Sequence, residues 1–195
     1  GRQLVRVAGR PLSLAVNLSS EQVTDPELAS RVSELQLLEP DVNLVLEFTE
    51  SVLLEDDDRT LHALEGLKAS GVRLAIDDFG MGFSSIAYLD RLPVDILKID
   101  KSFIAKLPNP RSTSLVRGII AMAHSMGLTV VGEGVEEPQD VAELRELGCS
   151  VGQGFLFGRA LDLPAARALI SQGPLDMTAP ASASRKHPYA PATVA

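Results

Sequence analysis

Polar side chains end a series of short apolar runs in this sequence. They are acids, amides and one lysine: Asn17, Glu47, Asp77, Asp78, Lys98, Asp100, Glu133 and Gln153. The adjacent carboxylates of Asp77 and Asp78 repel each other, which costs free energy unless a cation, hydrogen bonds or water relieve the repulsion. Carboxylate and amide oxygens are the ligands that hard divalent cations such as Mg²⁺ and Mn²⁺ prefer. The residues therefore predict a metal site, in which two carboxylates can serve two metals.

The apolar runs alternate with stretches of helical periodicity. Strands are expected over residues 12–19, 43–50, 72–79, 94–100, 128–135 and 149–155. Helices are expected over about residues 25–38, from 55–58 up to Gly71, and over about 112–126, 138–147 and 163–171. This alternation indicates parallel βαβ units, six in all. In a parallel α/β barrel the carboxyl ends of the strands converge on one face, where catalytic residues sit, so the polar residues are expected to meet there.

The overall composition is that of one globular domain. The chain has 195 residues, of which 45% are hydrophobic and 23% charged, which allows a sizeable core. Its formal net charge of -8 argues against an electrostatic grip on DNA or an anionic membrane surface, and metal ions would mediate contact with a phosphate ligand. Cys149 is the only cysteine, so no intrachain disulfide is expected and a reducing cytoplasm fits. No apolar run reaches the ~20 residues that span a bilayer, so no direct membrane insertion is expected.

Six short motifs along the chain carry a family likeness. They are VNLS (16–19), LEFTE (46–50), DDFGMGFSS (77–85), LPVDILKIDKSF (92–103), GEGVE (132–136) and GCSVGQGFLF (148–157). In type and order they resemble the successive motifs of the EAL domain family, from about Leu12 to Leu163. That family hydrolyses the bacterial second messenger cyclic di-GMP, so the resemblance implies a divalent-metal-dependent phosphodiesterase with linear pGpG as product. It also implies a modified TIM barrel, often paired as a homodimer.

The resemblance also implies a role for each motif residue. The implied metal ligands are Asn17, Glu47, Asp77 and Asp78, with Asp77 bridging two ions. The implied catalytic residues are Lys98 near the attacking water and scissile phosphate, Glu133 and Gln153 holding waters, and Glu50 steadying the loop after the double aspartate. Residues expected to face the substrate or support the loop are Glu136, Asp100, Phe79, Gly80 and Ser84.

The first residues of the chain lack the Glu-Ala-Leu motif from which the family takes its name. The glutamate of that motif is a metal ligand in the family, so the first βα units of an eight-stranded barrel are expected to be missing here. Residues 1–172 are interpreted as a partial EAL-type domain and residues 173–195, rich in Pro, Ala and Ser, as a disordered tail or linker. The parent protein is expected to be cytoplasmic or membrane-tethered, with an upstream sensor or diguanylate cyclase domain as a further possibility.

Other interpretations stay open on the sequence alone. The missing glutamate is compatible with a catalytically inactive receptor that binds cyclic di-GMP without turnover. Lys98 could instead form a Schiff base with a carbonyl substrate, although neighbouring carboxylates would keep its ammonium charged. Purely structural explanations are a helix cap at Asn17, Ser19 and Ser20, a helix cap at Asp77 and Asp78 before Ser84, and an ion pair of Lys98 with Asp100.

Overall fold

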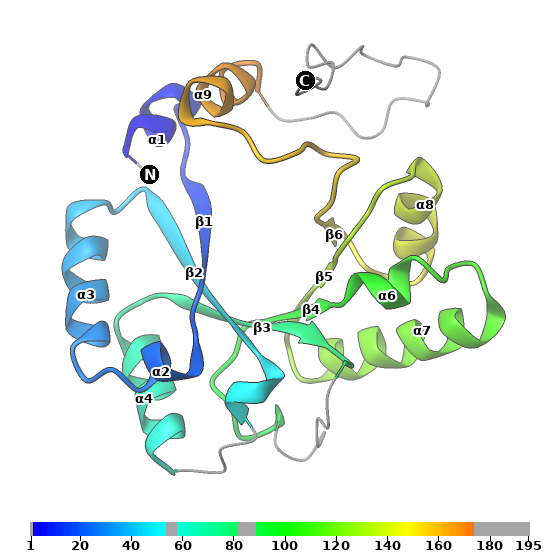
Figure 1. Ribbon diagram of the computed structural model, residues 1–195, viewed down its shortest axis with the longest axis horizontal. Coiled ribbons are helices and arrows are strands. Elements are labelled where there is room, and N and C mark those ends of the chain that lie inside the picture. Colours follow the sequence, from blue (N-terminus) through cyan, green and yellow to red (C-terminus); the bar gives the residue numbers. More distant parts are fainter. Residues whose placement is uncertain (1, 54–57, 82–88, 174–195) are drawn as a thin grey trace, which may run out of the picture.

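Six parallel strands form an open, curved sheet in the part of the chain that the structure describes (Figure 1). The computed structural model describes residues 2–53, 58–81 and 89–173. The strands lie in the sheet in the order of the sequence, as the alternating pattern predicts. Their bounds are β1 Leu12–Asn17, β2 Val42–Thr49, β3 Arg73–Phe79, β4 Ile96–Ile99, β5 Thr129–Gly132 and β6 Val151–Gly152.

Helices follow the strands and cover the outer face of the sheet (Figure 1). Those expected from the periodicity are α3 Leu28–Leu38, α4 Asp58–Ala69, α7 Pro110–Ser125, α8 Pro138–Glu146 and α9 Leu163–Ser171. Those that the periodicity did not indicate are α1 Arg2–Ala8, α2 Ser20–Val23, the 3₁₀ helix η1 Glu50–Leu53 and α6 Lys101–Ile104. Helices this short do not show an apolar period, so the sequence can indicate them only through their capping residues. Ser19 does cap α2, in a reciprocal capping box with Gln22.

The two faces of the sheet carry different side chains. On the outer face, Phe48, Leu74 and Leu97 are buried in the main core together with helix residues such as Leu64 and Val116. On the inner face, a smaller cluster contains Val45, Ala75 and Ile96, with Val131 packed against it. Because successive side chains of a strand point to opposite faces, residues two positions further along each strand also point inward. Those residues are Glu47, Asp77, Lys98 and Glu133.

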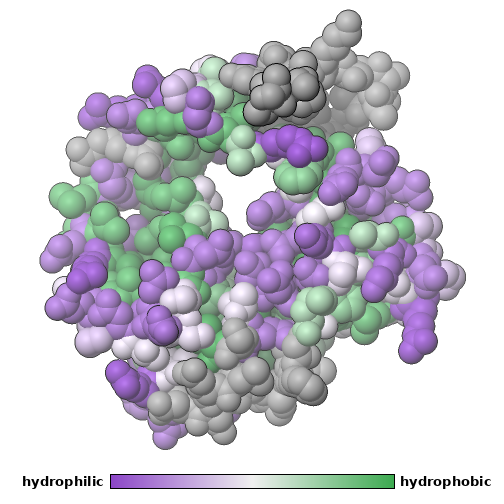
Figure 2. Space-filling view, in the orientation of Figure 1, coloured by the Kyte–Doolittle hydropathy of each residue, from purple (hydrophilic) through white to green (hydrophobic). Residues whose placement is uncertain are grey.

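The first strand of the sheet is exposed. Leu14 and Val16 of β1 are 40% and 41% exposed, and Val151 of β6 is 43% exposed. Figure 2 shows an opening near the middle of the molecule, bordered by both hydrophobic and hydrophilic surface. This arrangement is a parallel half-barrel, in agreement with the predicted barrel whose first βα units are missing. None of the described helices is long and apolar enough to cross a membrane.

Candidate active site

A buried lysine is surrounded by three carboxylates at the carboxyl end of the sheet. Lys98 of β4 is 3% exposed. Its Nζ donates to Glu47 Oε2 on β2 at 2.9 Å and to Asp77 Oδ1 on β3 at 2.8 Å, and it lies 2.8 Å from Glu133 Oε1, just after β5. Burial alone would lower the pKa of Lys98, but its hydrogen bonds to the three acids outweigh that effect and raise it above its ordinary value. Lys98 is therefore held as an ammonium ion.

A β-bulge explains how two adjacent aspartates both reach this site. Ile76 pairs with Leu97 and Phe79 with Ile99, so Asp77 and Asp78 together stand opposite Lys98 alone. Such a two-against-one register changes the direction of a side chain that would otherwise point to the other face. Asp78 has a φ of 53°, in the left-handed region that aspartate tolerates better than most residues. The sequence pattern did not predict this bulge.

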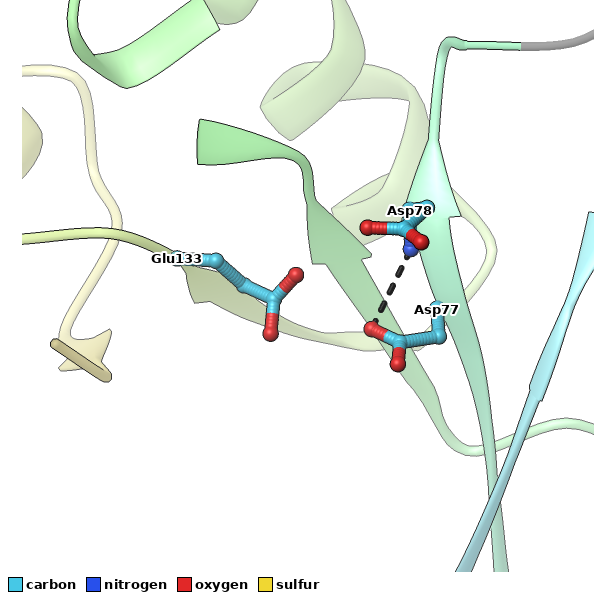
Figure 3. A group of neighbouring side chains, drawn as sticks. All are labelled: Asp77, Asp78 and Glu133. Carbon is cyan, nitrogen blue, oxygen red and sulfur yellow. Dashed lines mark hydrogen bonds between the residues drawn. The ribbon is translucent and has the colours of Figure 1, made fainter. Parts of the chain in front are cut away.

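The bulge brings three carboxylates from two strands together (Figure 3). Oxygens of Asp77, Asp78 and Glu133 lie within 4.8 Å of one another, and the Asp78 backbone N–H donates to Asp77 Oδ1 at 3.1 Å. Burial, with the charges of Asp77 and Asp100, raises the pKa of Asp78. Burial, with the charge of Asp77, also raises the pKa of Glu133, although Lys98 opposes the rise. A second cation would thus stabilise the ionised forms of both carboxyls.

The chemistry of the donor set fits a hard divalent ion. The group offers only carboxylate oxygens, which are the ligands that Mg²⁺ and Mn²⁺ take. Lys98 occupies one oxygen each of Glu47, Asp77 and Glu133, so the second oxygen of each carboxylate is not held by the lysine. Asp77, Asp78 and Glu133 are the best-placed ligands, with Glu47 beside them.

The loop after the double aspartate is anchored at two points. Glu50 is buried, and its Oε1 accepts a hydrogen bond of 2.7 Å from the Gly80 backbone N–H. Gly80 also lies against the ring of Phe103 on α6, so closely that a Cβ there would be 2.6 Å from Phe103 Cε2. Glu50 and Gly80 were predicted at this loop from the sequence, whereas Phe103 was not, because no local pattern indicates what its ring contacts.

The remaining predicted residues lie at different distances from the centre of the site. Asn17 ends β1, directly opposite Glu47, and is exposed. Asp100 does not pair with Lys98: it caps α6 by accepting from the Ser102 N–H, and hydrogen bonds from Ser102 and Asp78 lower its pKa although burial would raise it. Phe79 is buried behind the bulge.

Two predicted residues lie after the last strands, and one lies outside the described residues. Gln153 is exposed, and its backbone bonds Gly132 and Val135, on either side of Glu133. Glu136 is exposed, and its N–H donates to Asp140. Ser84, with the start of the helix that Asp77 and Asp78 were suggested to cap, and residues 174–195 of the expected tail are outside the described part of the chain.

Comparison with known proteins identifies the family. A family model described as the EAL domain matches residues 2–160. The chain belongs to the EAL domain family. The cyclic di-GMP phosphodiesterase NbdA of Pseudomonas aeruginosa is 52% identical over 123 residues, covering 63% of this chain and 16% of NbdA. The chain spans about a fifth of the length of most curated relatives that it matches.

Solved EAL structures share the fold. The EAL domain of Mycobacterium smegmatis DcpA has a TM-score of 0.82 and 37% identity, covering 89% of this chain and 79% of that chain. A manganese and cyclic di-GMP complex of Klebsiella pneumoniae BlrP1 has a TM-score of 0.71 and 28% identity, covering 80% of this chain and 41% of that chain. The family is metal-dependent, in agreement with the acidic centre of this EAL chain.

Proposed function

We propose that this EAL domain hydrolyses cyclic di-GMP to linear pGpG with the help of divalent metal ions, either Mg²⁺ or Mn²⁺. The observation that carries the proposal is the convergence of Glu47, Asp77, Asp78 and Glu133 around Lys98. Relatives named cyclic di-GMP phosphodiesterases support the substrate and the reaction. The manganese in the BlrP1 complex supports the class of metal.

Each residue of the centre has a chemical task in this proposal. Glu47, Asp77, Asp78 and Glu133, with Asn17 from β1, would hold the metal ions. Bound metal ions would bind phosphate oxygens and lower the pKa of the attacking water. Lys98 adds a fixed positive charge next to the position of an anionic phosphodiester. The same protonated state leaves the lysine without the free electron pair that a Schiff base requires, which argues against the lyase alternative.

Residues around the centre would hold its geometry. Glu50 supports the bulged loop through the Gly80 N–H, and Asp100 begins the helix behind Asp78. Gln153 is tied by its backbone to the segment that carries Glu133, which suits the role of holding a water beside that acid. Glu136, on the segment that follows Glu133, is proposed as an acid at the outer edge of the site.

The context of the whole protein is also a proposal. Since the chain spans about a fifth of the length of most matched relatives, a sensor or diguanylate cyclase domain elsewhere in the parent protein is proposed. A homodimer and a cytoplasmic location for this domain stay predictions. Light scattering of the 195-residue chain at micromolar concentration would test the dimer.

Chromatography of cyclic di-GMP incubated with the chain and Mn²⁺ tests the reaction. We expect pGpG to form, to disappear when EDTA is added, and to be lost in Glu47→Gln, which keeps the size of the side chain but removes its charge. Glu65→Gln, an exposed site on α4, is the matched control and should keep activity. Saturable binding without product would instead indicate a receptor. The absence of both binding and product would contradict the proposal for this chain.

A further inference from the structure

One ammonium group lies in contact with three carboxylates. Lys98 Nζ lies 2.9 Å from Glu47 Oε2, 2.8 Å from Asp77 Oδ1 and 2.8 Å from Glu133 Oε1. An ammonium has three donors and no acceptor; it donates hydrogen bonds to Glu47 and Asp77 and forms an ion pair with Glu133. The three acids come from three different strand ends, β2, β3 and β5, on both sides of β4. Lys98 is therefore the point at which these separate segments are joined.

The electrostatics of the group make this cation necessary. The side chains of Glu47, Asp77 and Glu133 are only 11%, 16% and 15% exposed, so water screens their mutual repulsion poorly. Without a cation, three ionised carboxylates in this space would separate or take up protons. Removing one partner of a buried ion pair is strongly destabilising for the same reason.

The geometry leaves room for a second cation. Lys98 holds a single oxygen of each acid, so the other oxygen of each acid is directed by the lysine without being bound by it. Asp78, which lies on the other side of Asp77 in the bulge, has no contact with Lys98 Nζ among the ion pairs of the described residues. A divalent ion next to Asp77, Asp78 and Glu133 would thus neutralise most of the negative charge that one lysine leaves uncompensated.

We propose that Lys98 is a positioning residue that serves as the resident cation of the metal-free site, assembling Glu47, Asp77 and Glu133 before a divalent ion binds. A divalent ion and Lys98 then stabilise the same carboxylates, so each substitutes in part for the other. This inference rests on the metal dependence in the proposed function. It goes beyond that function because it concerns the folded state without metal and without substrate.

The test is a comparison of thermal unfolding in EDTA and in Mn²⁺ for the wild-type chain and Lys98→Met. Methionine keeps much of the length of the side chain and removes its charge. In EDTA the variant should lose on the order of 10 °C in Tm, as expected for one broken buried ion pair in a domain of this size. Mn²⁺ should restore at least half of that loss and should raise the Tm of the variant more than that of the wild type.

Lys68→Met is the matched control. Lys68 of α4 forms an ion pair with Asp95, which lies just before β4, and both side chains are partly exposed. Its loss should lower Tm slightly and by the same amount in EDTA and in Mn²⁺. An equal loss for Lys98→Met in both conditions would overturn the proposal, because Lys98 would then be an ordinary structural ion pair. No loss would overturn it as well, because Lys98 would then not stabilise the three carboxylates.

A second variant covers the case in which Lys98→Met does not fold in EDTA. Adding Glu133→Gln removes one of the repelling charges, so the double variant should recover folding in EDTA, and failure to recover would also overturn the proposal. Mn²⁺ binding to the wild type, followed by electron paramagnetic resonance, separates the role of Lys98 from the proposed reaction. A wild type that binds Mn²⁺ but forms no pGpG would contradict the proposed reaction and leave the role of Lys98 intact.

Discussion

Gly80 is the residue whose replacement should disturb the bulged loop most directly. It has a φ of 99°, a backbone conformation that L-residues rarely adopt. A Cβ at this position would lie 2.6 Å from Phe103 Cε2 and 2.8 Å from Cζ, both much shorter than van der Waals contact. Gly80→Ala therefore combines backbone strain with a steric clash, next to the N–H that donates to Glu50.

The magnitude follows from the two terms. A side chain at positive φ costs about 1–2 kcal/mol. Overpacking against a ring that must move costs about 1–3 kcal/mol more. Gly80→Ala should therefore lower the free energy of unfolding by about 2–5 kcal/mol, a large part of the stability of an ordinary domain. Mn²⁺ binding should also weaken, because the loop at Gly80 directly follows Asp77 and Asp78 and its displacement would move their carboxylates.

Urea denaturation in EDTA measures the loss, and a double-mutant cycle separates its two terms. In the Phe103→Ala background the ring is gone, so Gly80→Ala should cost only the backbone term, about 1–2 kcal/mol. Gly66→Ala is the matched control: it lies within α4 with nothing near its Cβ position, so alanine should stabilise the chain by about 0.5–1 kcal/mol. Wild-type stability for Gly80→Ala, or a cost that Phe103→Ala leaves unchanged, would refute the contact between loop and ring.

Three further predictions concern single groups. Glu50→Gln should keep the acceptor for the Gly80 N–H, whereas Glu50→Leu should cost about 1–3 kcal/mol in urea denaturation; equal stabilities would contradict the anchoring role. Because the pKa values of Asp78 and Glu133 are raised, protons compete with metal at higher pH than at ordinary carboxyls, so the Kd for Mn²⁺ should begin to rise above the ordinary carboxyl range as pH is lowered; a Kd that stays constant down to that range would contradict this. Burial raises the pKa of the Cys149 thiol, so a thiol reagent at pH 8 should label it slowly in the native chain and rapidly in urea, and fast native labelling would show that Cys149 is accessible.

The periodicity of the sequence was enough to place most of the site. Alternation puts both residues of each of three pairs on the inner face: Val45 and Glu47, Ala75 and Asp77, and Ile96 and Lys98. In each pair the apolar residue comes first along the strand and the polar residue lies nearer its carboxyl end. Parallel pairing then brings these ends together, which local residue types and the βαβ alternation already indicate. The acidic centre was therefore predictable in outline before any coordinates were known.

Contacts between distant segments were not predictable in the same way. Which groups surround Lys98 depends on register: an ion pair with Asp100 was one alternative open on the sequence, whereas Asp100 caps α6 and the lysine reaches Glu47, Asp77 and Glu133. The helix α1, Arg2–Ala8, is too short to show an apolar period. Tertiary contacts of this kind are not written in any local stretch of sequence.

The bulge in β3 explains why the chain keeps two aspartates side by side. In a regular strand Asp77 and Asp78 would face opposite sides of the sheet, and one would be driven into the outer core, where an ionised carboxylate is very costly. The register shift against Ile99, and the φ of 53° at Asp78, turn the second carboxylate away from that core. Asp77 then meets Lys98, and Asp78 stands next to Glu133, beyond the reach of the lysine's three donors. The strain at Asp78 and its raised pKa are thus two consequences of a single arrangement, which leaves the site with more negative than positive charge when metal is absent.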